Sequence, residues 1–294
     1  MYLHAERTTL VRRVQVPTCS ISLTTKARNL ILNATLNAEL LARLADDHRL
    51  EPNALVIKSL DDGGSVTHRA DAALYPASML KTPLAAAVLA EAADGRINLT
   101  DRVEITRANM TYNDAPSPLV PGYWARIDEL CELAISRSDN VATNQLFDIA
   151  GRERATRIVA QRFGLTGTAF YRKLSGSEPL ISDPGWDGVH RNTHPANDAA
   201  RMFELIALDR VPHSDVLRGA LARQYWNDKL SKGVRAGDHF AHKTGDTNDV
   251  THDGGILTTA GGRNYIVVVY TGLSSTDEHN ARFGPFMRAL RDHL

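Results

Sequence analysis

The hydrophobic pattern changes its period along the chain. Leucines recur at helical spacing at positions 32, 36, 40 and 44 and predict a helix from Ile31 to His48. Helical patterns also dominate from Ser78 to Leu208, and a further helix is expected beyond Val216. Short segments that predict strands lie near both ends of the chain, at residues 53–59, 65–68, 240–243, 254–259 and 265–270.

Glycine-rich turns join neighbouring strands in this pattern. Asp61-Asp62-Gly63-Gly64 predicts a hairpin, and Gly261-Gly262 predicts a tight turn between two later strands. Because neither group of strands has enough partners alone, we expect both groups to pair in one sheet. The predicted fold class is α/β (α+β), with an antiparallel five-stranded sheet flanked by helices and an additional all-helical domain.

The order of these elements predicts a discontinuous domain organisation. We expect residues 1–30 to form an N-terminal arm with weak periodicity. Residues 31–75 and 209–294 would together build the sheet domain. Residues 76–208 would form the helical domain, with a proline- and glycine-rich Ω-type loop at about residues 172–192.

The charge balance restricts the class of partner. The chain has 34 lysines and arginines against 34 aspartates and glutamates, and a formal net charge of zero. No long-range field therefore draws it to nucleic acid or to an anionic membrane. No apolar run approaches the 18 residues that would predict a membrane span. We expect a small-molecule substrate, and the sequence leaves the oligomeric state open.

The first twenty residues bear on the cellular compartment. After Arg12-Arg13, the segment from Val14 to Cys19 is broken by polar residues and Pro17 and lacks the apolar core of a signal peptide. We therefore expect a cytoplasmic protein, or a periplasmic or secreted one if the true N-terminus differs. Cys19 and Cys131 are the two cysteines, and the sequence gives no support for a disulfide between them.

Three short strings carry the chemistry: Ser78-Met79-Leu80-Lys81, Ser138-Asp139-Asn140 and Lys243-Thr244-Gly245. Each alone has an ordinary interpretation, as a helix start with an exposed lysine, an N-cap or the end of a strand. Nothing about helix capping links three distant segments. Their joint occurrence therefore favours a single site for acyl transfer.

The first string predicts an activated serine. Ser78 and Lys81 are three residues apart, so their side chains would share one helix face. A lysine that burial keeps partly neutral can take the proton of a serine hydroxyl. Because proline is tolerated only in the first helical turn, Pro83 requires the helix to start near Ala77 or Ser78. This start would aim the positive helix end and the Ser78 N–H at an oxyanion.

The other two strings predict the remaining groups of the site. Ser138 could carry a proton to the leaving nitrogen, with Lys243 polarising its hydroxyl and attracting a substrate carboxylate. Asn140 offers an amide to a substrate carbonyl or to the first lysine. Thr244 could bind the same carboxylate, and the backbone N–H of Asp246 could supply the second oxyanion donor.

Metal and cofactor chemistries find little support. Four candidate ligands surround the third string, but their spacing fits no helical His-x-x-x-His pair. The chain contains neither a Gly-x-Ser-x-Gly elbow nor a Gly-rich phosphate loop. We therefore expect no metal and no cofactor. The four residues are His239, His242, His252 and Asp253.

The three strings, in this order and spacing, resemble the class A β-lactamase superfamily and the penicillin-binding proteins. The resemblance runs from about Glu39 to Leu294. It implies that Ser78 is the acylated nucleophile and Lys81 its partner. It also places Tyr112 where the family often has an aromatic wall, although a loop tyrosine without a role is an equal alternative. Asn192-Thr193-His194-Pro195 resembles the segment that closes the family's Ω loop.

The resemblance is incomplete at the group that releases the acyl chain. Class A enzymes carry an Ω-loop glutamate that activates water, and its position falls on Leu174 in this chain. Either a four-residue insertion makes Glu178 this base, or the chain lacks the usual one. Glu178 precedes Pro179, as in the family, but Ser182 stands where the family has asparagine. Asp183 is a weaker substitute.

A second departure concerns the substrate. Asp253 and Gly254 fall where many class A enzymes have a carboxylate-binding arginine. We expect a serine hydrolase that forms an acyl-serine intermediate, with β-lactamase activity as the leading hypothesis. The alternatives are a D-alanyl peptidase or esterase of the same fold, and a penicillin-binding protein that acylates without efficient turnover.

Overall fold

The computed structural model describes residues 36–176 and 181–294. The expected N-terminal arm, Cys19 and Glu178 lie outside the described residues. The described helices are α2 (Ala38–Asp47), α3 (Lys81–Ala93), α4 (Ile127–Ser136), α5 (Asn140–Ala150), α6 (Arg152–Phe163), α7 (Ala196–Ala207), α8 (Ser214–Ala222), α9 (Asp277–Asn280) and α10 (Phe283–Leu290). Four short 3₁₀ helices are η1 (Ala77–Leu80), η2 (Arg107–Asn109), η3 (Leu230–Gly233) and η4 (Arg291–His293).

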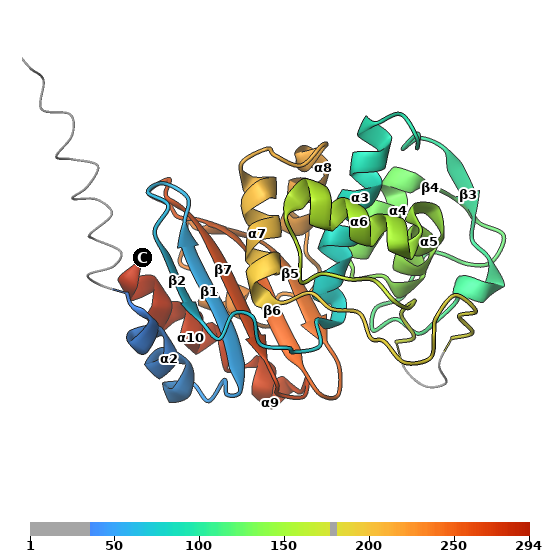
Figure 1. Ribbon diagram of the computed structural model, residues 1–294. Helices are drawn as coiled ribbons and strands as arrows, with labels where there is room; N and C mark the ends of the chain where they lie inside the picture. The colour runs from blue at the N-terminus through green and yellow to red at the C-terminus, as the bar shows by residue number, and fades with distance from the viewer. Residues whose placement is uncertain (1–35, 177–180) are drawn as a thin grey trace, which may run out of the picture.

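Strands from both ends of the chain form one antiparallel sheet of five strands, in the order β2-β1-β7-β6-β5 (Figure 1). Its strands are β1 (Asn53–Ser59), β2 (Ser65–His68), β5 (His239–Asp246), β6 (Thr251–Thr258) and β7 (Asn264–Thr271). The predicted fold class is therefore confirmed, and β5 is an edge strand of the sheet. Gly63 and Gly262 adopt positive φ values of 76° and 79° in the two predicted turns.

Helices cover both faces of the sheet. On the central strand β7, Ile266, Val268 and Tyr270 face a core shared with α3 and α7. The alternate residues of β7 face a second core shared with α2 and α10. Burial of both faces explains why β7 is a continuous apolar run, whereas an antiparallel strand with one solvated face alternates.

The helical part packs around α3. Most of this alanine- and leucine-rich helix is fully buried, from Lys81 to Glu91, so it lies at the centre of the helical part with α4, α5 and α6 against it. Pro83 is its third residue, where no intrahelical N–H is required. Contrary to the expectation of an all-helical region, a two-stranded sheet of β3 (Arg102–Glu104) and β4 (Trp124–Arg126) lies within it.

Other departures from the predicted elements concern their boundaries. Strand β6 begins at Thr251, three residues before the apolar pattern starts, because its first residues are polar but buried and hydrogen-bonded. The segment from Asp277 to Leu294 is divided into α9, α10 and η4.

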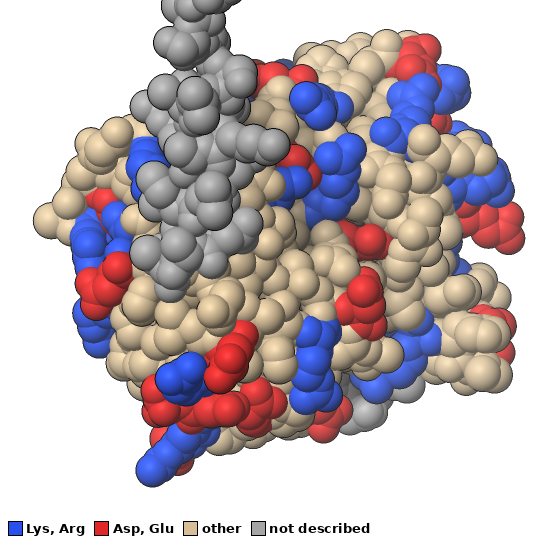
Figure 2. Space-filling view, turned by 60° about the vertical axis from the view of Figure 1, so that its left-hand side comes forward, with Lys and Arg blue, Asp and Glu red and all other residues tan. Residues whose placement is uncertain are grey.

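Charged side chains of both signs are mixed on the surface. On the face in Figure 2, lysines and arginines alternate with aspartates and glutamates, without a large patch of one sign. Within residues 36–176 and 181–294, no helix has the length and apolar character that a bilayer crossing requires.

Candidate active site

The first string forms a tight turn at the start of the central helix. Ser78 lies in the 3₁₀ helix η1, and α3 begins at Lys81, whose backbone N–H donates to the Ser78 carbonyl. In a 3₁₀ turn the side chains at i and i+3 eclipse, so Ser78 and Lys81 share one face. Ala77 has a φ of 47°, a strained value for a residue with a side chain. The half-buried Ser78 hydroxyl forms no hydrogen bond with the described residues.

Lys81 connects the first two strings. Its side chain is fully buried, and Nζ donates to the Ser138 carbonyl at 2.5 Å, to Ser138 Oγ at 3.2 Å and to Asn140 Oδ1 at 2.7 Å. Burial lowers the pKa of Lys81 to about 7, against the opposing charges of Asp139 and Asp114. A substantial fraction of this amine is therefore neutral near pH 7 and able to accept a proton.

The second string caps helix α5. The Asp139 carboxylate accepts from the backbone N–H of Ala142 at 2.9 Å, as an N-cap does. Ser138, just before it, has a φ of 57°. The cap fixes the backbone at Ser138, and the positive φ turns its carbonyl and hydroxyl toward Lys81.

The loop between η2 and β4 orients Asn140. The Asn140 backbone N–H donates to Asn113 Oδ1 at 2.5 Å, and its side-chain amide donates to the Tyr112 carbonyl at 2.8 Å. With Lys81 on the side-chain oxygen, this asparagine is fixed at both ends. The Tyr112 ring is 55% exposed and makes no aromatic contact in the described chain, so its proposed role as a wall depends on a bound substrate.

Strand β5 brings the third string against the nucleophile turn. A Cβ on Gly245 would lie 3.0 Å from the Pro76 carbonyl, 3.1 Å from Met79 Cγ and 3.2 Å from Ala77 Cβ. Glycine at this position lets the strand approach η1 closely. The three distant strings thus meet around one turn.

Lys243 lies on the Gly245 face of β5 and is fully buried. Its pKa is held well below the ordinary value, first by burial and then by the charge of Lys81. Nζ donates to the Thr244 carbonyl at 2.9 Å and makes no hydrogen bond to Ser138. The expected polarisation of the Ser138 hydroxyl by Lys243 is therefore not seen in this conformation.

The free edge of β5 presents backbone groups to the site. Thr247 N–H donates to the Val250 carbonyl at 2.9 Å, which makes this pair a hydrogen-bonded one. Hydrogen-bonded and non-hydrogen-bonded pairs alternate in an antiparallel ladder, so the backbone groups of Asp246 and Thr244 point away from β6. They point to the open edge, which places the Asp246 N–H where the second oxyanion donor is expected.

The Ω-type loop is closed by a β-bridge between Ala169 and Thr193. In this loop, both backbone groups of Leu174 are bound by the side chain of Asn144 from α5. The asparagine accepts from the Leu174 N–H at 2.8 Å and donates to its carbonyl at 2.8 Å. The Leu174 side chain is buried in the core. This position, aligned with the family's glutamate, therefore carries no carboxylate.

The two acids considered as alternative bases differ in their surroundings. Glu178 lies outside the described residues. Asp183 forms an ion pair with Arg152, and its second oxygen accepts from the Lys173 backbone N–H at 2.8 Å. Asp183 anchors the loop, and both of its oxygens are engaged, which makes it a poor candidate for a base that activates water.

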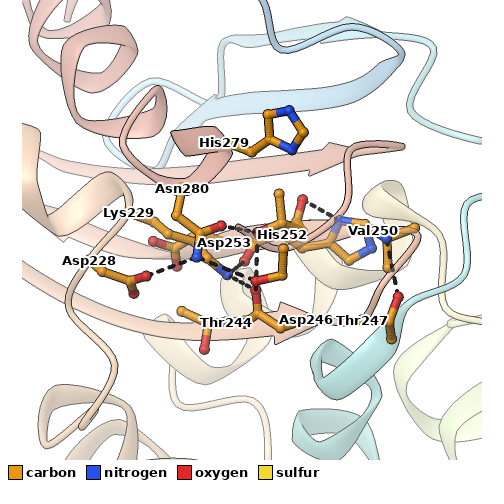
Figure 3. A network of polar contacts seen from close by, with 12 residues as sticks. Asp228, Lys229, Thr244, Asp246, Thr247, Val250, His252, Asp253, His279 and Asn280 are labelled. Atoms are coloured by element: carbon orange, nitrogen blue, oxygen red, sulfur yellow. Dashed lines mark hydrogen bonds and ion pairs between the residues drawn. The ribbon is translucent and has the colours of Figure 1, made fainter. Parts of the chain in front are cut away.

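A buried polar network lies on the face of β5 opposite to Lys243 and Gly245 (Figure 3). Lys229, which is 1% exposed, donates to Asp246 Oδ1 at 2.5 Å and to the His252 carbonyl at 3.1 Å. Asp253 accepts from His242 at 2.8 Å and from the Leu230 N–H at 3.0 Å. Two of the four candidate ligands near the third string, His242 and Asp253, are therefore hydrogen-bonded to each other. In the part of the chain that the structure describes, no cluster of metal-ligating side chains occurs.

Several residues of the site were missed by sequence reasoning. Asn113, Asn144 and Lys229 make contacts that depend on segments far apart in the chain. Only Asn144 had a visible signal, since it lies one turn after Asn140 on the same face of α5. Cys131 is buried, which raises the pKa of its thiol to about 12 and leaves it unreactive.

Comparison with known proteins agrees with this geometry. The model of the β-lactamase enzyme family matches residues 36–293. A β-lactamase of Rhodobacter capsulatus is 33% identical over 161 residues, which are 54% of this chain and about half (53%) of that protein.

Solved structures of similar fold cover most of the chain. An ancestral class A β-lactamase superimposes with a TM-score of 0.75 at 25% identity, over 87% of this chain and 99% of that one. PBP-A, in a leucine-to-glutamate variant caught as an acyl-enzyme with penicillin G, superimposes with a TM-score of 0.74 at 23% identity, over 88% of this chain and 99% of that one.

Proposed function

Since the chain belongs to the β-lactamase enzyme family, we propose that it is a serine hydrolase that opens a β-lactam amide through an acyl-serine intermediate. Ser78 is the nucleophile, Lys81 the base that accepts its proton, and Ser138 the group that delivers a proton to the leaving nitrogen. The observation that carries the proposal is the contact of the buried Lys81 amine with Ser138 and Asn140, one turn from Ser78.

Each group has a defined task in acylation. The Ser78 oxygen attacks the carbonyl carbon while its proton passes to neutral Lys81. The Ser78 and Asp246 backbone N–H groups stabilise the oxyanion of the tetrahedral intermediate. As the C–N bond breaks, the proton on Lys81 passes through the Ser138 hydroxyl to the nitrogen, since the two side chains are 3.2 Å apart. The product of this step is an acyl-serine in which the new amine remains attached to the acyl group, because the broken C–N bond belongs to the β-lactam ring.

Deacylation needs a base for water. Glu178 is the proposed base, on the resemblance given above. A second candidate function is favoured by Leu174, which stands where the family carries its glutamate. The side chain of Asn144 binds the backbone of this leucine. If Glu178 does not act, the protein is a penicillin-binding protein that acylates and stalls, or a peptidase or esterase with better substrates than β-lactams.

The test combines a chromogenic cephalosporin with intact-mass analysis of the full chain. We expect rapid colour development, and Ser78→Ala should abolish both turnover and the covalent adduct. Ser231→Ala is the matched control, because the buried Ser231 hydroxyl has no hydrogen-bond partner in the described residues. Adduct formation that survives Ser78→Ala would overturn the assignment of the nucleophile.

Glu178→Gln separates the two candidate functions. If Glu178 activates water, this variant should accumulate the acyl-enzyme while acylating at the native rate. A steady-state rate equal to that of the native chain would exclude Glu178 as the base. A native chain that itself accumulates the adduct would favour the stalled penicillin-binding protein.

A further inference from the structure

The side chain of Asp246 gives the site a negative charge. In strand β5 this residue lies two positions after Thr244, on the same face, at a Cα separation of about 6.5 Å. Its own backbone N–H is the proposed oxyanion donor. A group of the substrate bound at that N–H must therefore lie close to the Asp246 carboxylate.

The two oxygens of this carboxylate differ. Oδ1 accepts from Lys229 at 2.5 Å, from Ser275 Oγ at 2.6 Å and from Thr251 Oγ1 at 3.1 Å (Figure 3). Oδ2 has no hydrogen-bond donor among the described residues and is not among their buried unpaired atoms. The side chain is 31% exposed, so Oδ2 is the oxygen open to a ligand or to solvent.

Asp246 is ionised at neutral pH. Burial alone would raise its pKa, but the charge of Lys229 and hydrogen bonds from Lys229, Ser275 and Thr251 outweigh burial and lower the pKa below its ordinary value. The same ion pair engages the buried ammonium group of Lys229.

The other titratable groups next to Asp246 are engaged with one another or lie on the opposite face of β5. Asp253, the cross-strand neighbour of Thr244, is a second acid. His242, on the same face, contacts Asp253 at 2.8 Å and Asn227 at 3.1 Å. His252 pairs with Gly245 and therefore lies on the opposite face. Lys243 lies on the opposite face of the strand with its amine on the Thr244 carbonyl. A substrate carboxylate at the open edge of β5 beside Thr244 would therefore lie close to the Asp246 carboxylate.

We propose that Asp246 selects substrates by charge, so that the preferred acyl donor has no carboxylate on its leaving-group side. This inference rests on the proposed acylation of Ser78 and narrows its substrates to amides or esters with a neutral or cationic leaving group. An exposed carboxylate oxygen at that point disfavours an anion and tolerates a neutral or cationic group.

The magnitude follows from Coulomb's law. At about 6 Å and an effective dielectric constant of about 20, repulsion between two unit charges corresponds to roughly a hundredfold loss in rate. Lys229, on the far side of Asp246, offsets part of this repulsion, and we expect about a tenfold effect.

The test compares a chromogenic cephalosporin as its free acid and as its neutral methyl ester. Acylation rates of the full chain are measured by intact mass and divided by the hydroxide-catalysed rate of each compound, which removes their intrinsic difference in reactivity. We expect the native chain to favour the ester by about tenfold or more. Asp246→Asn should shift the ester-to-acid ratio toward the acid by a similar factor.

Two further variants complete the test. Asp249→Asn, which removes an exposed carboxylate at the tip of the same hairpin, should leave the ratio unchanged. If Asp246→Asn unfolds because Lys229 is left unpaired, the double variant Lys229→Met/Asp246→Asn removes both charges and should show the same shift.

The outcomes separate this inference from the proposed function. A native preference for the free acid, or a ratio that Asp246 substitutions do not change, overturns the charge selection while leaving the acylation of Ser78 intact. Absence of a Ser78 adduct with both compounds overturns the proposed function and the charge selection with it.

Discussion

Replacing Lys81 by methionine should reveal the energetic cost of the buried amine. The side chain is fully buried, and its pKa falls from the ordinary 10.5 to about 7. Between these values the unfolded chain binds a proton that the folded chain does not. The free energy of unfolding of the native protein therefore rises with pH over this range. The destabilisation caused by burying the charged Lys81 amine is fully present below about pH 7 and disappears toward pH 10.5.

The size of the effect follows from this shift. Each pKa unit is worth about 1.4 kcal/mol, so the native chain should gain about 2 kcal/mol of stability between pH 7 and pH 9 from this one group. Lys81→Met lacks the titrating amine and should not gain it. Lys243 is a second amine with a lowered pKa, but burial is its main cause and persists in the variant, so its contribution largely cancels.

Urea denaturation of both proteins at pH 7, 8 and 9 measures the difference directly. The difference in unfolding free energy between native and variant should change by about 2 kcal/mol over this range. Lys232→Met, at an exposed lysine, should keep a constant difference from the native chain. A constant difference for Lys81→Met as well would refute the lowered pKa and, with it, the neutral base. Ser78 should no longer be acylated in Lys81→Met.

Two further changes test how the site is assembled. Gly245→Val would bring side-chain atoms against the Pro76 carbonyl, which lies 3.0 Å from the position of a Cβ. This variant should slow acylation at least about tenfold and retain the circular dichroism spectrum. An unchanged acylation rate would show that close contact between the strand and the turn is not required. Asn144→Leu removes both hydrogen bonds to the Leu174 backbone and should destabilise the protein by about 2 kcal/mol in chemical denaturation, and a loss near zero would contradict the clamp.

The sequence predicted the convergence of the three strings for local physical reasons. The three-residue spacing of Ser78 and Lys81 decides which side chains share a face, and Asp139 starts helix α5 as an N-cap whether or not Ser138 is catalytic. Glycine at position 245 permits close packing of a strand. The catalytic roles of these side chains remain predictions.

Contacts between distant segments could not be predicted from the sequence. The hydrogen bond from Asn140 to Asn113 spans 27 residues, and the pairing of Lys229 with Asp246 spans 17. No periodicity connects such positions. Strand β6 was predicted too short because Thr251 and the residues directly after it are polar. These side chains are hydrogen-bonded in a buried network, which lets polar residues form part of a buried strand.

In the proposed mechanism, the Ω-type loop affects turnover more than acylation. Asn144 binds the main chain of Leu174, so the loop keeps its position whatever side chain stands there. A leucine at that position therefore keeps the backbone contacts of the loop and supplies no carboxylate. Asp183 cannot readily replace it, because Arg152 and the Lys173 N–H occupy its two oxygens. In the proposed mechanism, acylation and deacylation thus depend on separate parts of the site, and a change in the groups for deacylation leaves those for acylation in place.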